Sequence, residues 1–238
     1  MNFLEKALNF IFPPSCGICG KIGTSYLCNK CKDKLISSNI YFNQLEDYTH
    51  NNDKFIDEHF YLFSYSGMIR EKILQYKFND KAYLANTISE FFINNEKLCG
   101  FLQKYDIMIA IPISVLRKRE RGYNQSELIA KKISKTKCIC FDNSILQKVK
   151  NNKPQSSLHY EQRLENVKNV YKVQNEQKIQ DKSIVLFDDI YTTGATTNEC
   201  ARVLKQAGAK KVGILTVAKD FKKWVANWCT KHKSKEKG

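Results

Sequence analysis

The sequence predicts an α/β fold in which a parallel β-sheet is flanked by helices and preceded by a small N-terminal module with four metal-binding cysteines. Short apolar runs alternate with segments whose apolar residues recur every three or four positions, and this alternation predicts the sheet and its helices. One apolar run ends in acidic and hydroxyl residues, where parallel sheets place their ligand chemistry. Two Cys-x-x-Cys pairs near the N-terminus predict the module.

The chain is long enough for one medium-sized domain with a small appendage, and it is strongly basic. It has 238 residues, and its 39 Lys and Arg against 24 Asp and Glu give a formal charge of +15. Such an excess indicates a polyanionic partner, either nucleic acid or a phosphorylated ligand. The Lys-, Asn- and Ile-rich usage of an AT-rich genome is an alternative explanation, so the charge alone does not decide between them.

No secretion signal or membrane insertion is expected. The apolar opening from Phe3 to Phe12 is interrupted by Glu5, Lys6 and Asn9, and no small-residue cleavage site follows it. No apolar stretch approaches the length of a membrane-spanning helix. Four of the nine cysteines fall in two close pairs, which in such a chain favours metal-bound thiolates over disulfides. We therefore expect a cytoplasmic protein.

Five segments are expected along the chain. They are an N-terminal helix over 1–12 that a Pro-Pro pair ends, a zinc-binding module over 13–38, an Asn/Asp-rich linker over 39–57, the main α/β domain over 58–218 and a basic tail over 219–238. The tail carries Trp224 and Trp228, and it is interpreted either as a solvated end or as a nucleic-acid contact.

Within the main domain, apolar periodicity predicts the order of strands and helices. We expect strands over 59–65, 107–111, 184–187 and 212–217, and helices over 68–78, 82–98, 125–133 and 198–206.

The string from Ile184 to Thr197 is the strongest functional signal. A buried strand delivers two adjacent carboxylates, Asp188 and Asp189, to a turn of threonines and a glycine that opens a helix. Backbone N–H groups and the helix dipole at such a turn favour an anion. Phosphate would repel the carboxylates, so these must face ribose hydroxyls or Mg²⁺. The string therefore predicts a sugar-phosphate site. The alternative is that the acidic pair only ends a strand and caps a helix, but a cap needs one acidic residue and leaves the rest of the string unexplained.

A cluster of cations precedes the helix expected from Gln125. Arg117, Arg119 and Arg121 follow a buried strand and a tight turn, and Gly-Tyr-Asn-Gln comes next. The forked donors of arginine suit pyrophosphate. A solvated basic loop is the alternative.

Both strings resemble known families. Val185 to Thr196 closely resembles the loop of type I phosphoribosyltransferases that binds phosphoribosyl pyrophosphate (PRPP). The Arg-Glu-Arg-Gly-Tyr-Asn-Gln string from Arg119 to Gln125, together with the cysteine segment, resembles the ComF (ComFC-like) family, which is linked to DNA uptake during natural competence. The resemblance covers residues 13 to 218 and implies the type I phosphoribosyltransferase fold, with PRPP and Mg²⁺ as ligands.

The resemblance also implies roles for individual residues. The acidic pair would hold the ribose hydroxyls, the threonine loop would hold the 5′-phosphate, and the arginines would act on the pyrophosphate. The PRPP-binding residues are then Asp188, Asp189, Thr192, Thr193, Gly194, Ala195, Thr196, Lys77 and Arg119, and the catalytic residues are Asp188, Asp189, Arg119 and Arg121. Lys77 ends a Leu-Gln-Tyr-Lys string like the family's early lysine motif, but Phe-Asn-Asp replaces the glycine that usually follows. Pro154, Gln155, Leu158, Arg163 and Asn166 resemble the family's mobile loop.

The four paired cysteines predict a structural zinc site. Cys16-x-x-Cys19 and Cys28-x-x-Cys31 are separated by eight residues, and four thiolates close a tetrahedral Zn²⁺ site without leaving a position for a catalytic water. Disulfides are the alternative. The four histidines are scattered and form no triad pattern with a cysteine or serine, which disfavours nucleophilic hydrolysis.

Three functions follow from these patterns. As an enzyme, the protein would transfer the phosphoribosyl group of PRPP to an amine or ring nitrogen. As a DNA-handling protein, it would bind single-stranded DNA with cations and with aromatic residues such as Tyr123, Tyr160 or Trp224, and PRPP binding would be regulatory or vestigial. As a scaffold, it would dock a competence helicase. We favour PRPP binding with a role in DNA uptake; the alternative is a phosphoribosyltransferase of nucleoside or base salvage without a DNA role.

Overall fold

The computed structural model of the chain describes residues 13–48, 54–78, 81–150 and 166–221. Its elements, in chain order, are α2 (Asn29–Ile36), β1 (Tyr41–Asp47), β2 (Glu58–Ser64), α3 (Gly67–Phe78), α4 (Leu84–Ile93), α5 (Glu96–Leu102), β3 (Ile107–Ala110), α6 (Val115–Arg121), α7 (Gln125–Lys137), β4 (Cys140–Phe141), β5 (Leu146–Lys148), β6 (Tyr171–Val173), the 3₁₀ turn η2 (Glu176–Lys178), β7 (Ser183–Tyr191), α9 (Ala195–Gln206) and β8 (Lys211–Lys219).

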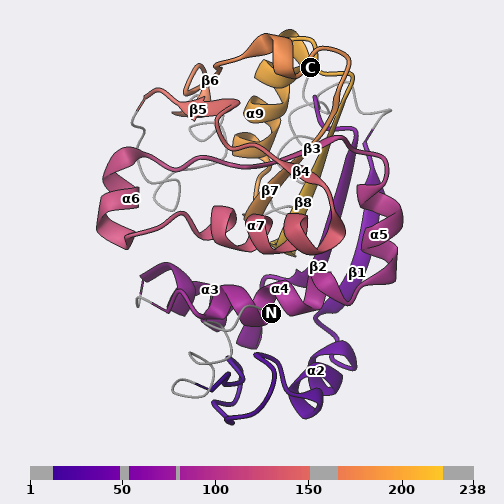
Figure 1. The fold of residues 1–238 in the computed structure, drawn as a ribbon, viewed down its shortest axis with the longest axis vertical. Helices are drawn as coiled ribbons and strands as arrows, with labels where there is room; N and C mark the ends of the chain where they lie inside the picture. The colour runs from indigo at the N-terminus through magenta and orange to yellow at the C-terminus, as the bar shows by residue number, and fades with distance from the viewer. Residues whose placement is uncertain (1–12, 49–53, 79–80, 151–165, 222–238) are drawn as a thin grey trace, which may run out of the picture.

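A six-stranded sheet with the order β1-β2-β8-β7-β3-β4 forms the centre of the described part of the chain (Figure 1). β2, β8, β7, β3 and β4 run parallel, and β1 pairs antiparallel with β2 at one edge. β5 and β6 form a separate antiparallel pair. Since parallel strands end at the same edge, the connections that follow β3 and β7 leave the sheet side by side.

Apolar side chains cover both faces of this sheet. Successive strand residues point to opposite faces, so β7 places Val185 and Phe187 in one hydrophobic cluster and Ile184 and Leu186 in the other. Helices α3, α4, α5 and α7 complete the first cluster, and α9 with the β5–β6 pair completes the second. The predicted α/β fold, with a mostly parallel sheet flanked by helices, is therefore confirmed.

The N-terminal cysteine module packs on α4. Thr87 of α4 donates from Oγ1 to the carbonyl of Tyr26 (2.8 Å) and accepts from the N–H of Gly17 (3.2 Å), while the N–H of Tyr26 donates to Glu90 Oε1 (3.0 Å). A Cβ on Gly17 would collide with the Thr87 hydroxyl, so glycine is required at this close approach. Leu27 of the module is buried in the first hydrophobic cluster, and Figure 1 shows α3 and α4 between the sheet and the module.

Part of the segment expected to be a linker is a strand. Residues 39–57 include β1, which extends the sheet by pairing with β2. The pairing is irregular between Tyr41 and Gln44, where Asn43 adopts a positive φ of 46°. This irregularity interrupts the alternation of inward and outward side chains that would otherwise indicate a strand. The polar composition of the segment therefore led to the prediction of a linker.

Three other expectations about elements are also corrected. The helix expected over 82–98 is two helices, α4 and α5, because the side chain of Asn95 accepts from the N–H of Leu98 (3.1 Å) and caps α5. β7 continues past Phe187 to Tyr191, and α9 begins at Ala195 instead of 198. The sequence also did not predict α6, β4, β5 or β6.

Some expectations lie outside the described residues. These are the helix over 1–12, the tail from 222 with its two tryptophans, and the loop residues Pro154, Gln155, Leu158, Tyr160 and Arg163. Among the helices that the structure describes, none combines the length and apolar character needed to span a membrane.

Candidate functional site

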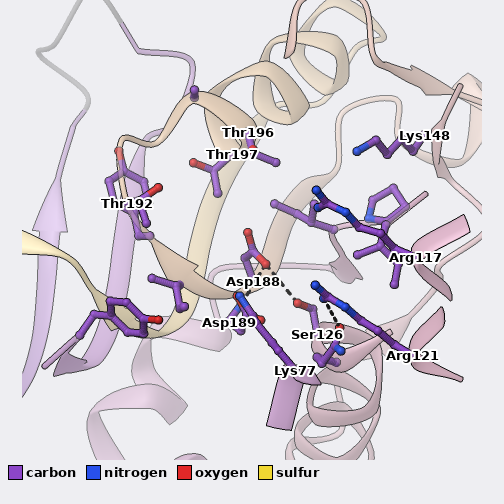
Figure 2. Close-up of a pocket in the computed structure, with 18 of the residues that line it drawn as sticks. Lys77, Arg117, Arg121, Ser126, Lys148, Asp188, Asp189, Thr192, Thr196 and Thr197 are labelled. Carbon is purple, nitrogen blue, oxygen red and sulfur yellow. Dashed lines mark hydrogen bonds and ion pairs between the residues drawn. The ribbon is translucent and has the colours of Figure 1, made fainter. Parts of the chain in front are cut away.

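A cavity of about 610 Å³ opens where the connections after β3 and β7 meet (Figure 2). Its walls come from α3, α6, the start of α7, the β5–β6 pair, the end of β7 and the turn into α9. The charged and polar side chains that line it are Lys77, Arg117, Glu120, Arg121, Gln125, Ser126, Lys148, Asp188, Asp189, Thr192, Thr196 and Thr197.

Two adjacent carboxylates lie at the floor of this cavity. Strand alternation sends Asp188 and Asp189 to opposite faces of β7. Asp189 forms an ion pair with Lys77 of α3, with 2.9 Å between Nζ and Oδ1. Asp188 accepts hydrogen bonds at Oδ1 from Ser126 Oγ of α7 (3.1 Å) and from the N–H of Asp189 (2.9 Å). Helices α3 and α7 therefore each fix one carboxylate (Figure 2).

Burial raises the pKa of the Asp188 carboxyl to about 7, and the nearby charge of Asp189 adds to the rise. The ammonium of Lys77 and the hydrogen bond from Ser126 act in the opposite direction. Near neutral pH this carboxyl therefore exchanges its proton easily. A cation or hydroxyl donors bound at the pair would favour its ionised form.

The turn into α9 forms an anion cradle over Thr192–Thr197. Gly194 caps the helix with φ at 76°, and a Cβ at this position would also collide with the hydroxyl of Tyr191. Every residue of the range except Thr193 lines the cavity; the Thr193 hydroxyl instead accepts from the N–H of Ala195 (3.4 Å). The first turn of a helix presents unpaired N–H groups and a positive dipole end, so the cradle suits a phosphate group.

Helix α6 carries cations to the opposite wall. Arg117 and Arg121 are four residues apart, so they share a face of the helix, and both line the cavity. Arg119 lies on the other face, exposed and outside the cavity lining. The guanidinium of Arg121 donates to Gln125 Oε1 (3.1 Å) and lies 5.0 Å from the ring centroid of Phe78.

β5 contributes a further cation to this wall, Lys148 (Figure 2). Burial lowers the pKa of the Lys148 ammonium to about 8, and the charge of Arg117 lowers it further. Its Nζ lies 5.7 Å from the ring centroid of buried Tyr171 on β6. An ammonium that is destabilised by burial and by a neighbouring cation gains from binding an anion, so this wall also suits phosphate groups.

The Gly-Tyr-Asn-Gln string joins α6 to α7 and fixes their positions. Gly122 ends α6 with φ at 72°. The hydroxyl of Tyr123 donates to the carbonyl of Tyr76 on α3 (2.6 Å), and Nδ2 of Asn124 donates to the carbonyl of Ile111 (3.0 Å). The side chain of Asn124 also accepts from the N–H of Ser126 and so caps α7 (3.1 Å). The string thus holds the cation-bearing helix against the end of the sheet.

The structure brings together most of the residues singled out in the sequence. Those that line the cavity are Lys77, Arg121, Asp188, Asp189, Thr192, Gly194, Ala195 and Thr196; Arg119 and Thr193 are not part of the lining. Arg117 of the predicted arginine cluster and Thr197 of the predicted phosphate string also line it. So do Gln125, Ser126, Lys148 and Tyr171, to which the sequence assigned no role at the site. Gln125 ends the Gly-Tyr-Asn-Gln string, which is a signal that would have found it, whereas nothing in the sequence marks Lys148.

The four paired cysteines form a cluster that can bind a metal ion. The sulfur atoms of Cys16, Cys19, Cys28 and Cys31 all lie within 4.8 Å of one another, and none is in a disulfide. The Sγ atoms of Cys19 and Cys28 are 3.8 Å apart. Two sulfur ligands of a tetrahedral ion with 2.3 Å bonds are separated by about the same distance, roughly 3.8 Å. The donor set fits a metal, and the alternative of disulfides is contradicted.

The fold and the site define a class of protein, and comparison with known proteins agrees. The chain belongs to the phosphoribosyl transferase domain family, whose model matches residues 101–235. It is 26% identical over 151 residues to competence protein F of Haemophilus influenzae, and these residues make up 62% of this chain and 66% of that protein. It is 30% identical over 150 residues to competence protein ComFC of Bacillus subtilis, and these residues make up 62% of this chain and 58% of that protein.

A further relative is the DNA utilization protein YhgH of Escherichia coli K12, 27% identical over 154 residues that cover 63% of this chain and 66% of that protein. These relatives confirm the resemblance to the ComF group. The match spans slightly less than two thirds of the length of each of these relatives. Among solved structures, a purine phosphoribosyltransferase from Pyrococcus horikoshii is similar with a TM-score of 0.36 and 18% identity, over 58% of this chain and 83% of that one.

The raised pKa of Asp188 predicts a pH-dependent gain from Asp188→Asn. The folded-state pKa of about 7 lies above the ordinary value of 3.8. The protonated carboxyl therefore contributes stability that is fully present below pH 4 and is lost as the pH rises through 7. The variant should be more stable than the wild type at pH 8, by roughly 1–4 kcal/mol in the free energy of unfolding, and the difference should shrink towards pH 4.

Urea denaturation of the ligand-free protein at pH 4, 6 and 8 measures this difference. Asp33→Asn is the control, because Asp33 is exposed on α2. Equal stability of Asp188→Asn and the wild type at pH 8 would contradict the expectation.

Proposed function

We propose that the cavity binds PRPP, a ribose that carries a phosphate at one end and pyrophosphate at the other. The observation that carries this proposal is the order of charges in one cavity. An anion cradle lies at the start of α9, two carboxylates lie in the middle, and cations from α6 and β5 lie beyond them (Figure 2). A polyol with an anionic group at each end matches this order, and membership of the phosphoribosyl transferase domain family supports the proposal.

Each part of PRPP is assigned to its own residues. The 5′-phosphate would occupy the cradle of Thr192–Thr197, and the ribose hydroxyls would donate to Asp188 and Asp189. The carboxylate oxygens are also ligands that Mg²⁺ prefers, and this ion would neutralise part of the pyrophosphate charge when bound. The pyrophosphate would lie against the cations of the cavity, Lys77, Arg117, Arg121 and Lys148.

This arrangement supports transfer of the phosphoribosyl group to a nitrogen acceptor. The C1–O bond to pyrophosphate breaks, its electron pair leaves with the pyrophosphate, the nitrogen forms the new bond to C1, and the nitrogen loses a proton. The cations stabilise the charge of the leaving group, and the carboxylates position the ribose while C1 becomes electron-poor. The protein would then be a glycosyltransferase, and its catalytic power would come from electrostatics and positioning.

Calorimetric titration with PRPP and Mg²⁺ tests the proposal. The wild type should bind PRPP, and the double variant Asp188→Asn/Asp189→Asn should bind at least about tenfold more weakly, because the ribose loses its two charged acceptors. Arg117→Ala should weaken binding similarly, whereas Arg119→Ala, two residues further along the same short helix but outside the cavity, should not.

Two results would count against this account. A folded wild-type protein that does not bind PRPP would contradict the function itself. Equal losses from Arg117→Ala and Arg119→Ala would contradict the assignment of the cavity wall.

We further propose that the protein handles single-stranded DNA during natural transformation. Its relatives are named competence proteins and DNA utilization proteins. The chain carries a formal charge of +15, and Arg119 of α6 and Lys132 and Lys135 of α7 are exposed. Exposed cations suit the phosphate backbone of DNA. The alternative is salvage of a base or nucleoside without a DNA role, for which release of pyrophosphate would depend on such an acceptor.

A competence helicase is a second partner that we propose. The cysteine module exposes two aliphatic side chains, Ile22 (66% exposed) and Ile36 (41%). These two side chains would contribute apolar area to such a contact.

Fluorescence anisotropy with a labelled oligothymidine tests DNA binding. The logarithm of the affinity should fall linearly with the logarithm of the salt concentration, and each lost phosphate contact should reduce the slope by about 0.7. Arg119→Ala/Lys132→Ala should therefore lower both the affinity and the slope. Lys30→Ala on α2 of the cysteine module is the control, because α3 and α4 lie between this module and the sheet (Figure 1). An affinity that does not depend on salt, or no binding at all, would favour the salvage alternative.

We propose Zn²⁺ as the metal of the cysteine cluster, in a structural role. Four sulfur donors favour zinc over the oxygen-preferring cations, and a closed site leaves no position for catalysis. Cys16 and Cys31 are buried in the first hydrophobic cluster, so the metal would stabilise part of the core. Reduced thiolates fit a reducing compartment, which supports a cytoplasmic location.

Removal of the metal should destabilise the protein. The purified chain should contain one Zn²⁺ per molecule, and Cys19→Ser/Cys28→Ser should lose the metal and melt at a lower temperature, because ligand loss removes the binding free energy from the folded state. Metal analysis and thermal denaturation measure both effects. Cys138→Ser/Cys140→Ser, at two exposed cysteines outside the cluster, should keep the zinc. A folded wild-type chain without zinc would refute the assignment.

A further inference from the structure

Gln125, the first residue of α7, has a side-chain amide that is only half satisfied. The residue is 1% exposed, and its Nε2 has no hydrogen-bond partner. Its Oε1 accepts from the guanidinium of Arg121 (3.1 Å), which fixes the orientation of the amide. The described residues contain two other buried polar side-chain atoms without a partner, His59 Nδ1 and Tyr105 Oη, but of the three residues only Gln125 lines the cavity. A buried donor without an acceptor is costly, so this one requires an explanation.

The backbone holds Gln125 in place beside the carboxylates. Its carbonyl accepts from the hydroxyl of Tyr76 (2.9 Å), and the next residue, Ser126, contacts Asp188 (3.1 Å). Figure 2 shows Ser126 and Arg121 on the side of Asp188 that faces away from Thr192 and the anion cradle. Gln125 therefore belongs to the end of the cavity opposite the cradle.

The groups around this amide define the ligand atom that it meets. Arg121, which contacts the amide, is a cation that only donates hydrogen bonds, and the start of α7 adds the positive end of a helix dipole. An acceptor atom with negative charge is therefore favoured at Nε2. In PRPP, the anionic oxygens at this end belong to the pyrophosphate, because the 5′-phosphate occupies the cradle.

We infer that Nε2 of Gln125 donates a hydrogen bond to a pyrophosphate oxygen of PRPP and so distinguishes PRPP from ribose 5-phosphate. This inference rests on the proposed function. Arg121 retains N–H groups for the same anion while one of them holds Gln125 Oε1, since a guanidinium has five. Nε2 is closed off from solvent in the ligand-free structure, so the contact requires a local adjustment of the side chains that cover it when the anion binds.

Two substitutions separate the donor from the acceptor of this amide. Gln125→Met removes both with little change in volume, whereas Gln125→Glu keeps an acceptor for Arg121 and removes the donor. Gln206→Glu is the matched control, because Gln206 on α9 also accepts from an arginine four residues earlier (Arg202, 2.7 Å) but is exposed and outside the cavity lining. Thermal denaturation shows whether each variant is folded.

Calorimetry with PRPP, with pyrophosphate alone and with ribose 5-phosphate, each with Mg²⁺, gives the readout. Both Gln125 variants should bind PRPP and pyrophosphate at least about tenfold more weakly than the wild type. Their affinity for ribose 5-phosphate should stay within about twofold of the wild type. Gln206→Glu should bind PRPP and pyrophosphate like the wild type. If one variant does not fold, wild-type affinity for PRPP in the other would still overturn the inference.

Three results would overturn the inference. Wild-type affinity for PRPP in the Gln125 variants would show that the amide does not contact the pyrophosphate. A loss in Gln125→Met alone would show that Gln125 acts only by positioning Arg121. An equal loss for PRPP and ribose 5-phosphate would place the contact elsewhere. A folded wild type that binds no PRPP would instead refute the proposed function together with this inference, so the two failures are distinguishable.

Discussion

The ion pair between Lys77 and Asp189 joins α3 to the end of β7, and the geometry of the cavity depends on it. Two adjacent carboxylates at the end of a buried strand repel each other and lose hydration, and the raised pKa of Asp188 reflects both effects. Lys77 offsets part of this cost and fixes one carboxylate, and Ser126 fixes the other. The protein thus keeps an acidic pair that burial alone would neutralise, which is typical of functional sites.

The order of strands explains how one cavity acquires two regions for anions. β7 lies between β8 and β3, so the connections that leave β3 and β7 are neighbours although they are far apart in the chain. The first connection leads into α6 with Arg117 and Arg121, and the second leads into the cradle at Gly194. An open parallel sheet places ligands at such an edge, and here the two connections supply its opposite walls.

The cysteine module shares a hydrophobic cluster with the cavity wall. Its contacts to Thr87 and Glu90 attach it to α4, and both α4 and α7 contribute to the first cluster. Because α7 begins with Gln125 and Ser126, a metal bound to the module would stabilise the core on which one wall of the cavity rests. The module is therefore integrated with the domain, and the strand β1 that follows it extends the same sheet.

The sequence by itself determined the features that are local in the chain. The acidic pair at the end of β7 and the threonines and glycine of the turn into α9 belong to one short segment, and the two cysteine pairs form one cluster that can hold a metal ion, so residue type and spacing were sufficient. Patterns that depend on regular alternation also identified the strands and helices of the main sheet. The same reasoning missed β1, where an irregularity at Asn43 breaks the alternation, and the break at Asn95 between α4 and α5.

Only the tertiary structure decided which cations face the cavity. Arg119 stands between Arg117 and Arg121 in the sequence, yet the turn of a short helix directs it away from the cavity. Lys148 reaches the cavity because β5 packs beside α9, and Lys77 reaches Asp189 because α3 covers one face of the sheet. These placements depend on contacts between distant segments, which no local pattern records.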